Sequence, residues 1–310
     1  MKILVTCPPM LKQLDKFKDL FIKYDMEITA PNVIQTLKVD ELIHLVPKHD
    51  GWIIGDDPAT EVVFAAGKKG KLKAAVKWGI GVDNVDFNAC KKLNIPITNT
   101  PGMFGNEVAD LAMCYILGLA RDAFLIDRSI RNGEWPKPSG LSLLNKKIGI
   151  LGLGDIGQNI AKRAHAHGFK VMGWDPNAKS INNYINLKPF WPDGISECDF
   201  LVFACALTKE TRHCFDHKLL TQLKRGVKFV NISRGSLVDE SALIKGLDEK
   251  IISSAALDVF ENEPLGLDHK ILKYPKCILG SHNGSNTSEG VSRVSEKALE
   301  ILDLMLNGKW

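Results

Sequence analysis

The chain lacks the features that mark membrane-spanning and secreted proteins. Its longest apolar run, Leu111–Ala120, covers ten residues, about half the length that a helix needs to cross a bilayer. The start of the chain, Met1–Val5, is followed almost at once by Pro8 and Pro9 and has no apolar stretch of the kind found in signal peptides. The seven cysteines are odd in number and include no Cys-x-x-Cys pair. We therefore expect reduced thiols in a cytoplasmic protein and no disulfide framework.

The chain also lacks a strong charge of either sign. Forty Lys and Arg residues against 36 Asp and Glu residues give a formal net charge of +4, without basic blocks. This small, dispersed excess does not indicate a nucleic-acid-binding surface. Hydrophobic residues make up 45% of the chain and charged residues 25%, which are values of globular proteins and exclude disorder, collagen and coiled coil. At about 150 residues per domain, 310 residues predict two domains.

Short β-branched runs alternate along the chain with longer helical patterns. This alternation is typical of βαβ units and predicts an α/β fold with parallel sheets. The expected strands are Ile3–Thr6, Trp52–Gly55, Ala75–Trp78, Ile97–Asn99, Ile148–Leu151, Lys170–Trp174, Phe200–Cys205, Lys228–Ile232, Ala255–Leu257 and Cys277–Gly280. The clearest expected helices are Leu11–Lys23, Asn106–Arg121 and Val291–Leu306.

Residues 132–145 form a segment rich in Gly, Pro and Ser, which predicts a loop or linker. The segment also carries Trp135, Leu141, Leu143 and Leu144. A solvated linker would not carry so many large apolar side chains, so we hypothesise that this segment contacts a partner surface.

A glycine-rich motif directly follows one expected strand. Gly152-Leu-Gly154-Asp-Ile-Gly157 comes after Lys147–Leu151 and opens a helical pattern, and Asp175 ends the next strand eighteen residues after Gly157. This is the spacing of a dinucleotide-binding βαβ unit. Gly152 allows the tight turn, Gly154 lets the backbone approach the diphosphate at the helix N-terminus, and Gly157 permits close packing of helix on strand.

The acidic residue after the second strand indicates which dinucleotide is bound. The Asp175 carboxylate can accept hydrogen bonds from both ribose hydroxyls and would repel a 2′-phosphate. No arginine follows in Pro176-Asn177-Ala178, so the sequence favours NAD over NADP. The alternative is a glycine-rich turn that binds nothing, and the strand, the helix and the acidic residue together argue against it.

Four later segments place polar residues where expected strands end. They are residues 205–211, 231–235, 258–264 and 282–285. Ligands of open α/β sheets bind beyond the carboxyl ends of the strands, so these segments can converge. They contain an arginine, a glutamate and a histidine. Around a nicotinamide site, an arginine can hold a carboxylate, a histidine can supply the proton that accompanies hydride transfer, and a glutamate can orient the imidazole.

These motifs resemble those of the NAD-dependent D-2-hydroxyacid dehydrogenases, and most closely the phosphoglycerate-dehydrogenase branch. The resemblance covers almost the whole chain and keeps the family's order: Gly79–Asp86, the glycine-rich motif, Asn231–Gly235, Asp258–Pro264 and His282–Ser285. It implies that Arg234 is the catalytic arginine, Glu263 the glutamate and His282 the acid/base histidine.

The resemblance also implies residues that bind the cofactor and the substrate. Asp258 would face the nicotinamide carboxamide. The full set implied for NAD is Gly152, Gly154, Asp155, Ile156, Gly157, Asp175, Cys205, Leu207, Thr211, Ile232, Asp258, His282 and Gly284. The loop with Ile80 and Gly81 would offer backbone N–H groups to the substrate carboxylate, beside Arg234. Lys77 and Trp78 would line the substrate pocket, the alternative being a surface charge and a core-edge ring.

The fold implied by the resemblance consists of two doubly wound parallel-sheet domains. A Rossmann NAD-binding domain (100–282) is inserted into a flavodoxin-like substrate domain (1–99), to which the chain returns at 283–310. In relatives the region around 100–145 builds a dimer contact, so we expect a homodimer. The sequence ends at Trp310, and we expect neither the regulatory domain of longer relatives nor control by serine.

The sequence departs from the phosphoglycerate branch at one informative point. Asp56 and Asp57 stand where that branch has an arginine, and two carboxylates would repel a phosphate, although Lys77 could receive one. The substrate therefore stays open between 3-phosphoglycerate and a smaller acid such as hydroxypyruvate or glyoxylate.

Two rival functions follow from the same resemblance. A formate-dehydrogenase-like enzyme would also use arginine and histidine but typically has glutamine in place of the glutamate, so Glu263 argues against it. An NAD-binding corepressor-like module would keep the fold without turnover, and we expect no long recruiting extension of the kind that such a module would use.

The remaining candidate groups do not indicate other chemistry. We expect no metal site. His165 and His167 are two apart on an expected helix and point to different faces. His213 and His217 could share a helical face, but no Glu or Cys completes a ligand set there. Cys205 has no paired histidine and is predicted to be a packing residue. Glu261, the neighbour of Glu263, is predicted to be a solvated loop charge.

Overall fold

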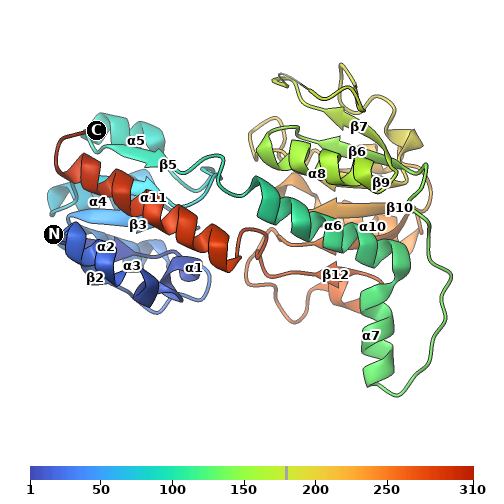
Figure 1. Ribbon diagram of the computed structural model, residues 1–310, viewed down its shortest axis with the longest axis horizontal. Helices are drawn as coiled ribbons and strands as arrows, with labels where there is room; N and C mark the ends of the chain where they lie inside the picture. Colours follow the sequence, from blue (N-terminus) through green and yellow to red (C-terminus); the bar gives the residue numbers. More distant parts are fainter. Residues whose placement is uncertain (179–180) are drawn as a thin grey trace. The chain divides into compact units, whose positions relative to one another are not determined.

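The computed structural model describes residues 1–178 and 181–310, which form two compact units (Figure 1). The first unit consists of Met1–Phe104 and Ser285–Trp310, and the second consists of Gly105–Gly284. The second unit is therefore inserted into the first, whose two pieces lie at opposite ends of the chain. The boundaries that we expect from the sequence are 99/100 and 282/283.

The first unit is built on a five-stranded parallel sheet in the order β2-β1-β3-β4-β5, which is the flavodoxin-like order. Together with the second sheet described below, it confirms the predicted class of two parallel-sheet α/β domains. The strands are β1 (Lys2–Val5), β2 (Glu27–Thr29), β3 (Gly51–Ile54), β4 (Ala74–Lys77) and β5 (Ile97–Asn99).

Helices cover both faces of this sheet. Leu4 and Trp52 point to one face, where they pack with α3 (Val39–Leu45), α4 (Glu61–Lys69) and α5 (Phe87–Leu93). The other face is covered by α11 (Ser288–Leu306), which packs on β3 and β4 (Figure 1). The returning segment thus completes the core of the first unit.

The predicted single helix over Leu11–Lys23 is wrong. The structure has α1 (Pro8–Leu11), a 3₁₀ turn (Leu14–Phe17) and α2 (Lys18–Lys23) instead. The backbone leaves the helical region at Gln13, with φ −127° and ψ 18°. Five apolar residues suggest one continuous helical face, namely Leu11, Leu14, Phe17, Leu20 and Phe21, but only Phe17 is fully buried. The helical periodicity of apolar residues is present in the sequence, but only one of the five positions is fully buried in the core.

The second unit contains a seven-stranded parallel sheet in the order β12-β11-β10-β9-β6-β7-β8. Starting at β6, the order runs outward in both directions, as in a Rossmann fold with one additional strand. The strands are β6 (Lys147–Leu151), β7 (Lys170–Trp174), β8 (Ile185–Leu187), β9 (Phe200–Phe203), β10 (Val227–Asn231), β11 (Ile252–Leu257) and β12 (Ile278–Leu279). Our prediction lacks β2 and β8, which are three-residue strands at the sheet edges.

One face of this sheet carries α6 (Gly105–Arg121) and α8 (Asp155–Ala166), which pack against each other (Figure 1). α6 is buried on several faces, as its uniformly apolar sequence predicts. It is followed by α7 (Ala123–Arg131). On the other face lie α9 (His217–Leu220) and α10 (Glu240–Asp248).

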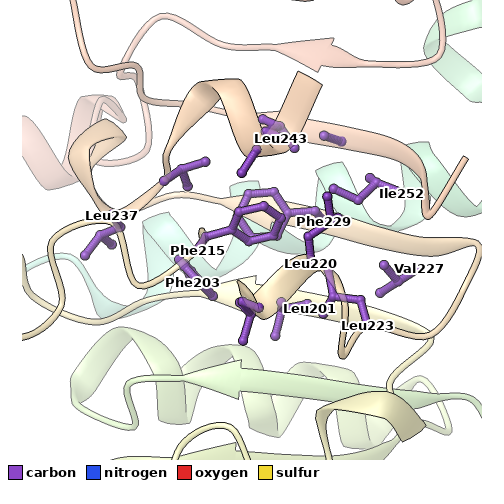
Figure 2. Close-up of a cluster of buried hydrophobic side chains, with 14 of the residues drawn as sticks. Leu201, Phe203, Phe215, Leu220, Leu223, Val227, Phe229, Leu237, Leu243 and Ile252 are labelled. Carbon is purple, nitrogen blue, oxygen red and sulfur yellow. The ribbon is translucent and has the colours of Figure 1, made fainter. Parts of the chain in front are cut away.

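An aromatic cluster fixes the strands that carry the candidate site. The rings of Phe203, Phe215 and Phe229 contact one another in the core between β9, β10 and α10 (Figure 2). The ring centres of Phe203 and Phe229 are 5.1 Å apart at an interplanar angle of 87°, and those of Phe215 and Phe229 are 4.7 Å apart. Such edge and tilted contacts add to the burial of large apolar surfaces. The carboxyl ends of β9 and β10 are therefore held by rigid packing.

Candidate active site

The glycine-rich motif forms the turn from β6 into α8. Gly152 has a φ of +92°, and a Cβ there would lie 2.6 Å from the Cα of Cys205. A Cβ on Gly157 would lie 1.9 Å from the carbonyl oxygen of Gly152. Both positions therefore require glycine, the first for its backbone conformation and the second for the close approach of helix and turn.

The N-terminus of α8 has the properties of a phosphate site. Gly154 is the N-cap and supplies no side-chain hydrogen bond to the helix. A Cβ on Gly154 would meet no atom within 4 Å among the described residues, so there is open space beside the N-cap of this helix. Asp155 and Ile156 follow in the first turn of this helix. Uncapped N–H groups and the helix dipole together favour an anion.

Asp175 stands at the carboxyl end of β7, where the ribose of a dinucleotide is expected. Its Oδ2 accepts a hydrogen bond from the Leu153 N–H at 2.8 Å, and its Oδ1 accepts one from the Asn177 N–H at 2.8 Å. These bonds fix the carboxylate, and an ionised carboxylate has further acceptor positions on both oxygens. The donors of α8 and the acceptors of Asp175 fit the diphosphate and the diol of a dinucleotide.

His282 and Glu263 form a close pair in the second unit. His282 Nδ1 lies 2.8 Å from Glu263 Oε2, and the two side chains are 23% and 19% exposed. Glu263 is held in turn, because its Oε1 accepts a hydrogen bond from the Phe260 N–H at 2.9 Å. The carboxylate fixes the proton on Nδ1, so Nε2 is the ring nitrogen that can exchange a proton with a substrate.

The backbone around His282 is held by Asp258. His282 has a φ of +55°, in the left-handed region, and its N–H donates to the Asp258 carbonyl at 2.6 Å. The Asp258 carboxylate accepts hydrogen bonds from the Gly284 N–H at 2.8 Å and from the Tyr115 hydroxyl at 3.0 Å. Burial, and then the Asp258 charge, raise the pKa of Tyr115, which keeps this hydroxyl a donor. A strained conformation of this kind persists only where its surroundings fix it.

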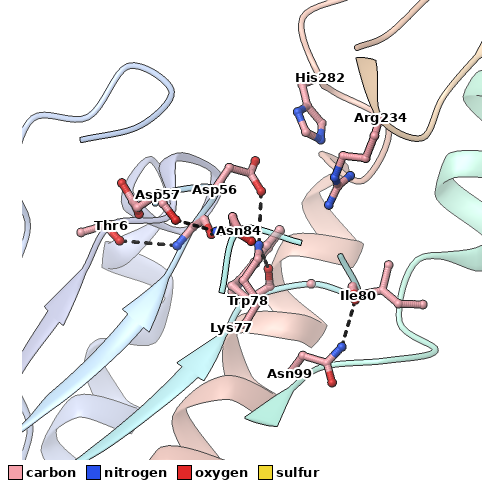
Figure 3. Close-up of polar contacts among 12 residues, drawn as sticks. Thr6, Asp56, Asp57, Lys77, Trp78, Ile80, Asn84, Asn99, Arg234 and His282 are labelled. Carbon is pink, nitrogen blue, oxygen red and sulfur yellow. Dashed lines mark hydrogen bonds and ion pairs between the residues drawn. The ribbon is translucent and has the colours of Figure 1, made fainter. Parts of the chain in front are cut away.

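Arg234 lies in the turn after β10. The side chain of Asn231 shapes this turn, donating to the Arg234 carbonyl at 2.8 Å and accepting from the Ser233 N–H at 3.1 Å. The Arg234 guanidinium donates to the Ser233 carbonyl at 2.9 Å. In Figure 3 the Arg234 side chain and the His282 ring project in the same direction from this unit.

The turns that carry Arg234 and Glu263 are in direct backbone contact. A Cβ on Gly235 would lie 1.9 Å from the Phe260 carbonyl carbon and 2.3 Å from the Glu261 nitrogen. Residue 235 must therefore be glycine for the two turns to pack. The predicted arginine, glutamate and histidine thus lie on segments that touch one another within the second unit.

Among the remaining predicted cofactor residues of this unit, three lie in or against the core and one lies in an exposed turn. Cys205 and Leu207 pack against the aromatic core, and Ile232 is 6% exposed. Thr211 shapes its own turn, since its hydroxyl donates to the Ala206 carbonyl at 2.8 Å and accepts from the Thr208 N–H at 2.7 Å.

In the first unit, Lys77 and Trp78 are buried. The Lys77 ammonium lies 3.2 Å from Asp56 Oδ1 and donates to the Trp78 carbonyl at 2.9 Å, with only 4% of the side chain exposed (Figure 3). The Trp78 indole N–H donates to Ser295 Oγ at 3.1 Å. The positive charge of Lys77 is therefore matched inside the protein.

The following loop is more exposed. The Ile80 side chain is 43% exposed, and its carbonyl accepts a hydrogen bond from the Asn99 side chain at 3.0 Å (Figure 3). Gly81 follows in the same loop. Of the predicted substrate residues of the first unit, this loop is the accessible part.

The two neighbouring aspartates have different surroundings, which corrects our description of them as a pair of carboxylates near a phosphate. Asp56 forms an ion pair with Lys77, whereas Asp57 is fully buried and accepts a hydrogen bond from the Leu37 N–H at 2.8 Å. Its Oδ2 has no hydrogen-bond partner within the described part of the chain. Burial raises the pKa of Asp57. Asn84, which we do not predict, donates to the Asp57 carbonyl at 2.7 Å.

The other histidines and Glu261 have local partners. Glu261 is an exposed loop residue, as predicted, and its Oε1 lies 2.5 Å from His213 Nε2. His217 Nε2 lies 3.1 Å from Ser241 Oγ. In residues 1–178 and 181–310, no group of three or more His, Cys, Asp or Glu side chains is arranged to hold a metal. No helix in these ranges is long and apolar enough to cross a bilayer.

The sequence profile of the D-isomer specific 2-hydroxyacid dehydrogenase NAD-binding domain matches residues 113–284. The chain belongs to this family. It is 34% identical to a hydroxypyruvate reductase of Thermotoga maritima, with 91% of both chains covered. It is 32% identical to a glyoxylate reductase of Thermococcus litoralis, covering 96% of this chain and 91% of that one. The TT0316 protein of Thermus thermophilus superposes with a TM-score of 0.88 at 29% identity, over 100% and 98% of the two chains.

Membership of this family establishes the class of reaction. The chain is an NAD-dependent oxidoreductase that acts on 2-hydroxy or 2-oxo acids. The matched range contains the glycine-rich turn, Asp175, and the turns of Arg234, Glu263 and His282. NAD is the cofactor of this domain, in agreement with the donors of α8 and the acceptors of Asp175.

Proposed function

We propose that the chain reduces a small 2-oxo acid, glyoxylate or hydroxypyruvate, to the D-2-hydroxy acid. The observation that carries this proposal is the 2.8 Å contact between His282 Nδ1 and Glu263 Oε2. When bound, NADH supplies the hydride for C2 of the substrate. The α8 N-terminus holds the diphosphate, and Asp175 accepts from the ribose hydroxyls.

The side chains of the second unit supply the proton and bind the substrate. His282 delivers the proton from Nε2 to the oxygen at C2. Glu263 stabilises the charged imidazole before that transfer, because an opposite charge at hydrogen-bond distance favours the protonated form. Arg234 binds the carboxylate and polarises the carbonyl of the substrate. On the first unit, we assign the backbone N–H groups of Ile80 and Gly81 to the substrate carboxylate, as the family resemblance implies.

The choice of a small acid rests on the surroundings of Lys77. Its ammonium is paired with Asp56 and is almost fully buried, so its charge is balanced before any substrate arrives. A phosphate on the substrate would therefore find no unbalanced positive charge at Lys77. The similarity to a hydroxypyruvate reductase and a glyoxylate reductase supports the same choice.

The test is a screen of NADH oxidation with glyoxylate, hydroxypyruvate, pyruvate and 3-phosphohydroxypyruvate, together with formate-dependent reduction of NAD⁺. We expect the highest kcat/KM for glyoxylate or hydroxypyruvate. His282→Gln should lose at least ~10²-fold in kcat, whereas His217→Gln, at an exposed histidine, should keep the parent rate. A preference for the phosphorylated acid or for formate would contradict the substrate, and binding of NAD without any turnover would favour a binding module.

We further propose that the protein is a cytoplasmic homodimer. Trp135 and Leu144 are 78% and 67% exposed in the 132–145 segment, which is a large apolar exposure for a free loop. All seven cysteines are free thiols, in accord with a reducing compartment. Light scattering should give twice the chain mass, and Trp135→Ser with Leu144→Ser should shift it towards the single-chain mass. A monomeric parent protein would contradict the dimer, and recovery in an oxidising compartment would contradict the location.

A further inference from the structure

The loop that carries Glu263, residues 258–269, is fastened to α10 by one side chain. Glu240 is the first residue of α10. Its Oε1 accepts a hydrogen bond from the Glu261 N–H at 3.1 Å, and its Oε2 lies 2.9 Å from His269 Nε2. One carboxylate therefore holds the loop at two points, one before Glu263 and one after it.

The hydrogen bonds of His269 define its protonation. Its Nδ1 accepts a hydrogen bond from the Ile271 N–H at 3.2 Å, so Nδ1 carries no proton. Nε2 must then carry the ring proton and donate a hydrogen bond to the Glu240 carboxylate. The two side chains are only 24% and 21% exposed, which favours a maintained contact over a transient surface pair. The His269 ring also packs edge-on against Phe260, with 6.3 Å between ring centres.

The stretch held by Glu240 is the one that supports Glu263. The Phe260 N–H donates to Glu263 Oε1, and Glu263 Oε2 contacts His282. Gly235 presses against the backbone of Phe260 and Glu261 from the turn of Arg234. The backbone at 260–261 is thus placed between Gly235 and Glu240, and the position of the Glu263 carboxylate follows from it.

We propose that Glu240 is a positioning residue that fixes Glu263 against His282. This inference rests on the proposed function, because it assigns Glu240 to the same proton-transfer pair. Glu240 touches neither substrate nor cofactor and acts through the loop. Besides His269, charged side chains on the elements packed against this stretch include Glu261, which is paired with His213, and Asp239, which caps α10 and faces His217. Arg234 precedes Gly235 on the turn that contacts Phe260.

The experiment compares Glu240→Ala with Glu249→Gln, which changes a carboxylate at the exposed end of α10. Two quantities are measured for each variant: kcat against pH in the reductive direction, and the titration of the His282 ring by NMR. The His282 signal is assigned from its absence in His282→Gln. Glu240→Ala should lower kcat about tenfold, since small misplacements of catalytic groups have effects of this order or larger. It should also shift the His282 titration to lower pH, whereas Glu249→Gln should change neither quantity.

A double variant separates positioning from general damage. If Glu240 acts through Glu263, Glu240→Ala should add no further shift of the His282 titration in a Glu263→Gln background. A further shift there, or a parent-like titration in Glu240→Ala with only a lowered Tm, would overturn the proposal. Glu240→Gln keeps an acceptor for the Glu261 N–H and should retain part of the rate. The NMR titration does not require turnover, so a protein that fails to reduce any 2-oxo acid would contradict the proposed function and still test this one.

Discussion

The Tyr115 hydroxyl and the Asp258 carboxylate, 143 positions apart in the sequence, are joined by a hydrogen bond of 3.0 Å in the core of the second unit. This bond links α6 to the segment that holds His282. Tyr115→Phe would leave a buried carboxylate oxygen without this donor. Hydrogen bonds to charged groups contribute about 1.5–3 kcal/mol, so urea denaturation should show a loss of this size. Tyr24→Phe in the first unit is the control and should leave the free energy of unfolding unchanged.

The pairing of Glu263 with His282 predicts a pH effect. Glu263→Gln removes the negative charge that favours the imidazolium form, so the imidazole should lose its proton at lower pH. The falling limb of the reductive pH profile should therefore move down by about one pH unit. Steady-state kcat against pH measures the shift. A profile that coincides with that of the parent would exclude the pairing from the mechanism.

Replacing either of two glycines of the same motif with alanine should have different effects on Tm. Gly154→Ala places a methyl group in open space at the N-terminus of α8. The protein should fold with the parent Tm but bind NADH more weakly, because the methyl group occupies the place of the diphosphate. Gly157→Ala would put a Cβ 1.9 Å from a backbone oxygen, so it should lower the Tm as well. Calorimetry and NADH fluorescence titration separate the two outcomes, and equal Tm losses would contradict the assignment.

Asp56 should control discrimination against phosphorylated substrates. Asp56→Asn removes the carboxylate charge and leaves the Lys77 ammonium without its ionic partner. The ratio of kcat/KM for 3-phosphohydroxypyruvate to that for hydroxypyruvate should rise about tenfold, which corresponds to 1.4 kcal/mol. Glu61→Gln, an exposed acidic change in the same unit, provides the control. If the ratio does not change, Asp56 does not face the substrate.

Asp57 should make stability depend on pH. Burial raises the pKa of Asp57 above its usual value of 3.8, so the folded state binds this proton more tightly than the unfolded state. The contribution of the group is fully present below about pH 3.8 and is lost as the pH rises through the folded pKa. Asp57→Asn cannot titrate, and its Tm relative to the parent should therefore increase between pH 4 and pH 7. A constant difference would show that Asp57 is not the cause.

The strands of both sheets could be predicted because parallel strands are buried on both faces and read as continuous apolar runs. The edge strands β2 and β8 could not, since Glu27–Thr29 and Ile185–Leu187 are too short to show such a run. The break near Gln13 was also hidden, because helical periodicity persists across it.

The site residues of the second unit lie on turns directly after strands, which is why sequence position alone could suggest them. The environments of Lys77 and Asp57 depend instead on contacts made after folding. The Lys77 charge is matched by Asp56, 21 residues earlier, and Asp57 is buried while its immediate neighbour is not. Glu240 carries no motif, and its two partners, 21 and 29 positions away, are visible only in the folded chain.

The interrupted layout of the first unit has a consequence for synthesis on the ribosome. The sheet built from residues 2–99 lacks the helix that covers β3 and β4 on one face until α11 has been translated. Gly105–Gly284, by contrast, is contiguous and can fold as soon as it emerges. The first unit, whose sheet is translated first, is therefore completed last. The face of the sheet that α11 will cover stays accessible to chaperones while the intervening 180 residues are made.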